Sequence, residues 1–241
     1  MTIVDAIVIL FLLLGAVLGF KKGAIRSLVG LVGTIAVVVI AYYLKNPVAD
    51  LLYNFVPFFD FSGDWQGLVT LNILLYEAIA YVLVFVVLYS LLSLILKLTG
   101  IIEKVLTMTI ILGIPSKIIG AVLGFLEAVV FSFIILFVLL QFNGSHVWIK
   151  ESTVAMSILD KTPLIGSMVN DTYDAILEIS DLQEKYEGSD NKTAYNGEIL
   201  SIMLKYHVIT PETTRKLIDS EKLNFAGAET ILNTFEEENN D

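Results

Sequence analysis

The stretch "GFKKGAIRSLVGLVG", residues 19–33, joins two runs of almost pure hydrocarbon and decides the fold. It carries Lys21, Lys22 and Arg26, three of the chain's fifteen basic residues, although the formal net charge is -10. A short turn between two apolar runs of about 20 residues is typical of a hairpin of transmembrane helices. We name Lys21, Lys22, Gly23 and Arg26 the basic turn.

The composition is that of a membrane protein with two unlike parts. The 241 residues are 56% hydrophobic and 17% charged, with a mean hydropathy of +0.79, whereas about a quarter of an average soluble domain is charged. Residues 1–142 hold seven basic and seven acidic side chains, and residues 143–241 hold eight basic and eighteen acidic ones. We therefore expect a four-helix transmembrane domain over 1–142 and an acidic, helical, soluble tail over 143–241.

Four apolar runs are long enough to cross a bilayer core of ~30 Å as helices. They cover residues 3–20, 24–44, 68–96 and 118–142. Helices satisfy their own backbone groups, as lipid requires, so the predicted fold is all-α and polytopic. The first run lacks a basic segment before it and a cleavage pattern after it, which indicates a retained span rather than a signal peptide.

Basic residues in the connections predict the topology, because short basic loops stay in the cytoplasm. The basic turn and the connection after the third run, with Lys97, Lys104 and Lys117, together place six basic residues on one side. The loop after the second run, which opens at Lys45 and contains Pro47 as a helix breaker, has one basic residue beside three Asp. We expect both termini, and with them the tail, to be extracytoplasmic.

Apolar spacing in the tail predicts helices over residues 162–186 and 198–218. Thr210 followed by Pro211 predicts a helix N-cap with proline at the first helical position.

Small residues recur at four-residue spacing inside two runs: Gly15 and Gly19 in the first, and Gly120, Gly124 and Ala128 in the fourth. This spacing places them on one helix face and allows a second backbone to approach closely. We predict helix packing there, against either the same chain or a second copy.

Three acidic residues lie inside the runs. Glu127, roughly 15 Å deep by the helical rise, shares a face with the glycines and has no basic residue at matching depth. A carboxyl group there is either part of a proton or ion relay or a protonated acid bonded to a neighbouring helix, and we favour the second. Asp5 suits a helix N-terminus. Glu77 has candidate donors in Asn72, Tyr76 and Tyr81, with a water-filled vestibule as the alternative.

Several site classes find no support in the sequence. The chain has no Cys, and His146 and His207 are far apart, so we expect no metal and no cofactor. It contains no HExxH, G-x-S-x-G or phosphate-loop motif, so we expect no enzymatic activity. An acidic chain without a long basic run does not predict nucleic-acid binding.

The order of these features resembles the CvpA family, the colicin V production proteins, and in particular its Gram-positive branch. The resemblance rests on an Asp inside the first run, on "GFKKGAIRSL", on "IIGAVLGFLEAVV" and on "ESTVAMSILDKTPLIGSMV". The matching positions are Asp5, Gly19, Lys22, Gly23, Arg26, Gly120, Gly124, Ser152 and Pro163.

The resemblance implies a multi-pass bacterial membrane protein required for export of a peptide toxin and associated with the envelope. We expect an accessory or scaffold protein that contacts the lipid bilayer and either a second copy of itself or other envelope and export proteins. The alternative is a small oligomeric transporter or channel in which Glu77 and Glu127 line a polar path.

Overall fold

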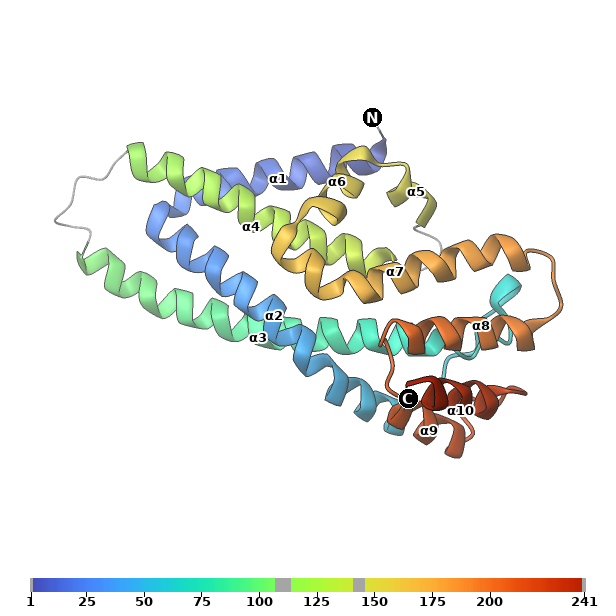
Figure 1. The fold of residues 1–241 in the computed structure, drawn as a ribbon. Helices are drawn as coiled ribbons and strands as arrows, with labels where there is room; N and C mark the ends of the chain where they lie inside the picture. Colours follow the sequence, from blue (N-terminus) through green and yellow to red (C-terminus); the bar gives the residue numbers. More distant parts are fainter. Residues whose placement is uncertain (1, 107–113, 141–145, 240–241) are drawn as a thin grey trace. The chain divides into compact units, whose positions relative to one another are not determined.

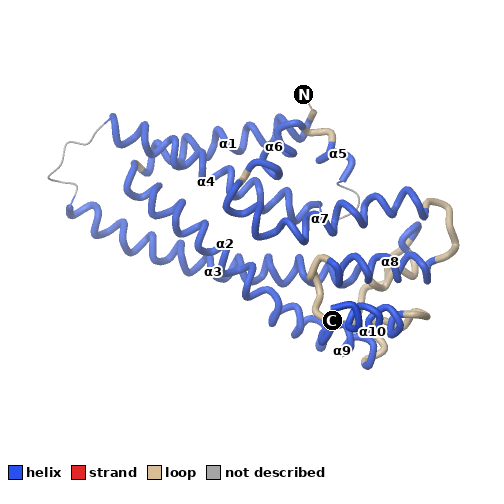
Figure 2. Tube along the Cα trace, in the orientation of Figure 1, coloured by secondary structure: helices blue, strands red, loops and turns tan. Residues whose placement is uncertain are grey.

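The computed structural model describes residues 2–106, 114–140 and 146–239. All regular elements in these ranges are helical, which confirms the predicted all-α fold (Figure 2). In chain order they are α1 (Ile3–Lys22), α2 (Ala24–Phe55), the 3-10 turn η1 (Gly63–Trp65), α3 (Leu71–Leu106), α4 (Ile114–Leu140), α5 (His146–Lys150), α6 (Thr153–Lys161), α7 (Pro163–Tyr186), α8 (Lys192–Lys205), α9 (Pro211–Asp219) and α10 (Ala228–Asn239).

Four helices are long and apolar enough to cross a membrane, as the sequence predicts. They are Ile3–Lys22, Ala24–Phe55, Leu71–Lys97 and Ile114–Leu140. The second differs from the predicted run, because α2 continues through Pro47 to Phe55 instead of giving way to a loop at Lys45. Ala49 and Tyr53 are buried on this extension, so packing outweighs the helix-breaking tendency of proline.

Contacts between Cα atoms divide the chain into two compact units. Unit 1 comprises residues 1–44 and 81–166, and unit 2 comprises residues 45–80 and 167–241. The helices α2, α3 and α7 each contribute to both units. This division follows contacts, whereas the expected boundary after residue 142 follows composition and stays a prediction.

In unit 1, α1 lies along α4, and the short helices α5 and α6 follow α4 in the chain and pack on it (Figure 1). A capping box starts α1, because the Thr2 hydroxyl accepts from the Asp5 N–H and the Asp5 carboxylate accepts from the Thr2 N–H. The opposite face of α1 leaves large aliphatic side chains such as Ile7 and Leu10 about 60% exposed. Such a face suits lipid rather than water.

In unit 2, α8, α9 and α10 pack around an apolar core, and α10 contacts both other helices. The core side chains are at most 2% exposed and include Ile199, Leu200, Met203, Leu204, Leu217, Leu223 and Leu232. The predicted cap is confirmed: α9 begins at Pro211, and the Thr210 hydroxyl accepts from the Thr213 N–H at 3.2 Å. These three helices therefore share an apolar core within unit 2.

Candidate functional site

The small residues of α1 and α4 lie against one another and bring the two backbones into contact. A Cβ atom on Gly15 would lie 2.7 Å from the Gly124 carbonyl oxygen, and one on Gly124 would lie 2.7 Å from the Gly19 Cα. Gly120 and Ala128 continue the same line of contacts. Backbone atoms cannot rotate aside, so this helix pair needs glycine at these positions. Both helices belong to the same chain.

The basic turn joins α1 to α2 beside the start of α4. Gly23 has φ +81°, a conformation that L side chains rarely adopt. The Ala24 N–H donates to the Ser116 hydroxyl oxygen of α4 at 3.1 Å, and the buried Ser27 hydroxyl donates to the Gly19 carbonyl at 3.3 Å. These bonds connect three helices at one end of unit 1.

Glu127 of α4 is buried, and polar groups from α1 and α2 surround its carboxylate. Its Oε2 lies 3.4 Å from the Lys22 ammonium, and its Oε1 accepts from the Thr34 hydroxyl at 3.3 Å. A Cβ on Gly30 would lie 3.2 Å from Oε1, so the glycine leaves room for the carboxylate. The side chain of Lys22 is 36% exposed and that of Glu127 is 8% exposed.

From the sequence, no basic residue is expected at the depth of Glu127, and the ion pair with Lys22 corrects the expectation that the acid is protonated and bonded only to a neutral partner. Lys22 is the last residue of α1 and lies after its apolar run, so its backbone is at the end of the span. Its flexible four-carbon stem can carry the ammonium away from its Cα. The side chain uses that reach to turn toward the Glu127 carboxylate rather than toward water.

Asp5 links the beginnings of α1 and α6. Besides closing the α1 capping box, its Oδ1 accepts from the Ser152 hydroxyl at 2.5 Å and from the Val154 N–H at 3.0 Å. Ser152 in turn caps α6, because its oxygen accepts from the Ala155 N–H at 3.1 Å. The buried carboxylate therefore faces the N-terminal ends of two helices, where a negative charge is favourable. Asp5 thus lies in the first turn of α1, the position that suits an acidic side chain.

Glu77 of α3 belongs to unit 2, where it pairs with α2. Lys45 donates to Oε2, and the Tyr53 hydroxyl donates to Oε1 at 3.2 Å. Two of the three donors expected on its own helix bond elsewhere: Tyr76 to the Pro57 carbonyl at 2.6 Å, and Asn72 to the Phe59 and Val69 carbonyls. Both partners of Glu77 come from α2, so the pairing of α2 with α3 decides them.

The tail helices of unit 2 bond to the ends of α2 and α3. Lys222 donates to the Tyr53 carbonyl and, at 2.9 Å, to the Val56 carbonyl, where α2 ends. The buried Asn196 of α8 accepts from the Thr70 N–H at 3.0 Å and donates to the Gly67 carbonyl at 2.8 Å, just before α3 begins. A cation at a helix C-terminus and a buried amide with partners for both of its polar atoms are stabilising.

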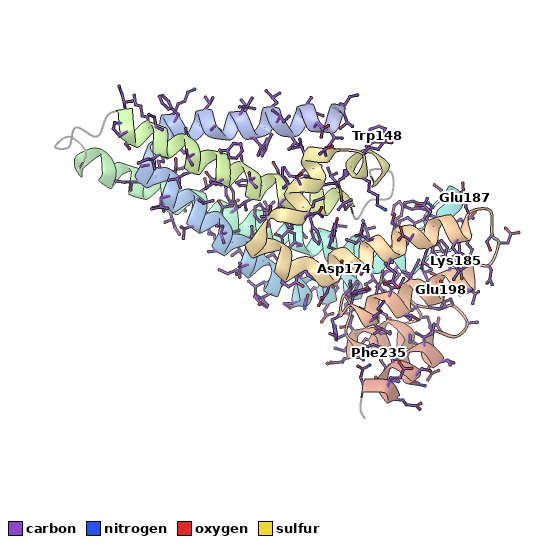
Figure 3. All side chains as sticks on the ribbon, turned by 45° about the horizontal axis from the view of Figure 1, so that its top comes forward. Trp148, Asp174, Lys185, Glu187, Glu198 and Phe235 are labelled. Carbon is purple, nitrogen blue, oxygen red and sulfur yellow. The ribbon has the colours of Figure 1, made fainter. Side chains whose placement is uncertain are left out.

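Exposed ion pairs join α7 to α8. Lys185 bonds Glu198 at 2.6 Å, and Figure 3 shows the two side chains on these neighbouring helices. Lys205 bonds Glu178 at 2.9 Å. The hydrogen bond from each lysine holds the pKa of its glutamate below the ordinary value. Because these groups face water, each pair contributes little to stability.

Sequence reasoning did not anticipate several polar residues at these sites: Thr34, Lys45, Tyr53, Asn196 and Lys222. The sequence marks these residues only as polar positions in or beside apolar runs, and it does not say which partners they meet. Within the described ranges, no group of three or more His, Asp or Glu side chains is arranged to hold a metal ion. The clusters join helices through pairs of opposite charge and hydrogen bonds.

Most of the chain is similar to known proteins. The family model described as "Colicin V production protein" matches residues 4–163, which include the glycine contacts, Glu127 and the Asp5–Ser152 bond. An "Uncharacterized transmembrane protein YshB" of Bacillus subtilis (strain 168) is 29% identical over 180 residues, covering 70% of this chain and 96% of that protein. No solved structure matches the chain significantly. The chain belongs to the colicin V production protein family of multi-pass membrane proteins.

Proposed function

We propose that the protein is a non-enzymatic accessory or scaffold protein of the bacterial plasma membrane that supports toxin export and envelope maintenance. The observation that carries this proposal is that Asp5, Glu77 and Glu127 are each satisfied by donors of the protein itself. A relay needs acids that can exchange partners with a transported ion or proton. These three acids instead hold helix ends and helix pairs together.

The family membership supports the association with toxin production, because the matching model carries that name. The match ends at residue 163, so α8, α9 and α10 lie beyond it. In this proposal the membrane helices form the support, and the acidic tail, outside the cytoplasm, contacts envelope or export proteins.

The test is complementation of a deletion strain of the native bacterium. Secretion of a peptide-toxin reporter and survival of cell-wall stress would be measured with the wild type, with Glu127→Gln and with Gly124→Leu. Glutamine keeps the shape of the side chain and can still accept from Thr34, so Glu127→Gln should restore both readouts. Gly124→Leu should restore neither, because it separates α1 from α4.

Reconstitution of the same variants in vesicles tests the transport alternative. Ion or proton flux in the wild type that disappears in Glu127→Gln, with the protein still folded and inserted, would contradict the scaffold proposal. Rescue by Glu127→Gln without any flux above that of empty vesicles would support it.

A further inference from the structure

We propose that unit 1 binds the headgroup of an anionic phospholipid at one end of its helices. The binding surface consists of Lys21, Arg26 and Lys117 beside the ring of Phe20, and we name it the basic face. The proposal rests on how these residues are brought together, on their lack of ion-pair partners among the described residues and on the apolar surface next to them.

Two contacts bring the basic residues of three helices together. The Lys117 ammonium of α4 lies 5.7 Å from the centre of the Phe20 ring, next to Lys21 on α1. The preceding residue of α4, Ser116, accepts from the Ala24 N–H, two residues before Arg26 on α2. The close approach of α1 and α4 at their glycines keeps these ends adjacent.

Among the described residues, no ion pair neutralises the charges of the basic face. In the described part of the chain, none of the ion pairs involves Lys21, Arg26 or Lys117. Lys22 differs, because it turns inward to Glu127. Lys21 and Lys117 are exposed, and Arg26 is half-buried. Three cations that share one membrane surface attract anionic headgroups.

The surroundings of the basic face favour a lipid over a soluble anion. Large aliphatic side chains are more than half exposed on α2 and α4 directly beside it, namely Ile25, Leu28, Ile118 and Ile119. A ligand that contacts both the basic face and these apolar side chains needs a negative group next to hydrocarbon chains. A phospholipid such as phosphatidylglycerol has that structure, and a free phosphate has no chains for the apolar side chains to contact.

The test measures lipid retention by the purified full-length protein. The protein would be taken from membranes of equal phosphatidylglycerol and phosphatidylcholine content into mild detergent, and its bound lipids counted by native mass spectrometry. We expect phosphatidylglycerol to be retained over phosphatidylcholine by about tenfold or more, with the preference falling as salt is raised. Lys21→Gln/Arg26→Gln/Lys117→Gln should abolish the preference.

Two further variants test whether the lipid preference depends on the basic face rather than on correct folding or on the net charge of the protein. The swap Lys21→Arg/Arg26→Lys/Lys117→Arg keeps the charges and should keep the preference. Lys185→Gln/Lys205→Gln/Lys216→Gln removes three charges from the tail and should also keep it. The proposal is overturned if the neutral basic-face variant retains the preference, if the tail variant loses it equally, or if soluble glycerol phosphate displaces the lipid.

Discussion

Glu127 shows how a single carboxylate is accommodated in a helix bundle that faces lipid. A lone charge at that depth would cost several kcal/mol. The Lys22 ammonium offers an opposite charge, Thr34 offers a hydrogen bond, and Gly30 leaves the space for both. Because Lys22 is 36% exposed, its ammonium can return to water when the carboxylate is absent.

This asymmetry predicts the result of a double-mutant cycle. Lys22→Gln leaves a buried carboxylate without its cation and should lower the free energy of unfolding by about 1–3 kcal/mol. Glu127→Gln should lower it less, and the double variant should resemble Glu127→Gln. The measurement is unfolding in mild detergent, followed by circular dichroism. Additive effects of the two substitutions would show that the residues are not coupled.

The glycines of α1 and α4 make a second prediction at the residue scale. Gly124→Ala places a Cβ 2.7 Å from the Gly19 Cα and should lower the free energy of unfolding by about 1–3 kcal/mol. Gly197→Ala in α8 is the control, since its Cβ would meet only the end of the Ile231 side chain, at 3.1 Å. That substitution should be neutral or stabilising. Equal effects in the same detergent melts would argue against a backbone contact.

At the scale of elements, α2 is a long helix whose two parts belong to different units. Residues 24–44 are apolar and span about 31 Å by the helical rise, close to the thickness of a bilayer core. Residues 45–55 instead carry Lys45, which pairs with Glu77, and end at carbonyls that Lys222 caps. The second part of α2 is thus held by polar contacts and by burial in unit 2.

Lys222 should therefore stabilise the end of α2. Lys222→Met removes two hydrogen bonds and a cation at a helix C-terminus, and should lower the free energy of unfolding of unit 2 by about 1–2 kcal/mol. It should also speed proteolysis of the tail. Lys216→Met, which removes the exposed pair with Glu212, should cost less than about 0.5 kcal/mol. If both variants are cleaved at the same rate, Lys222 does not hold the tail.

For the whole molecule, orientation in the membrane decides which compartment supplies the partner. The chain has no cysteine, so single cysteines can be introduced and labelled without interference. We would substitute the exposed residues Lys21 in the basic turn, Ser62 in the loop before α3 and Glu187 after α7 (Figure 3).

We expect a membrane-impermeant thiol reagent applied to intact cells to label Ser62→Cys and Glu187→Cys but not Lys21→Cys. The reason is the excess of basic residues on the side of the basic turn. Labelling after cell disruption controls for access to all three positions. The opposite pattern in intact cells would place the tail in the cytoplasm and would redirect the search for partners there.

Much of the architecture was predictable from the sequence, because it depends on local patterns. Apolar runs of bilayer length predict the four spans, and 3.6-residue periodicity predicts the tail helices. The threonine and proline before α9 predict its start, since a cap is made by residues three apart. The end of α2 was not predictable, because Pro47 is a local breaker that distant packing contacts outweigh.

The sequence by itself determined that this is an all-helical, multi-pass protein of the colicin V production protein family. Only the tertiary structure decided which polar groups meet: Lys22 with Glu127, Lys45 with Glu77, and Ser152 with Asp5. These partners lie between 32 and 147 residues apart. Whether they meet depends on which helices pair and in what register, which is a property of the packed chain and not of any local pattern.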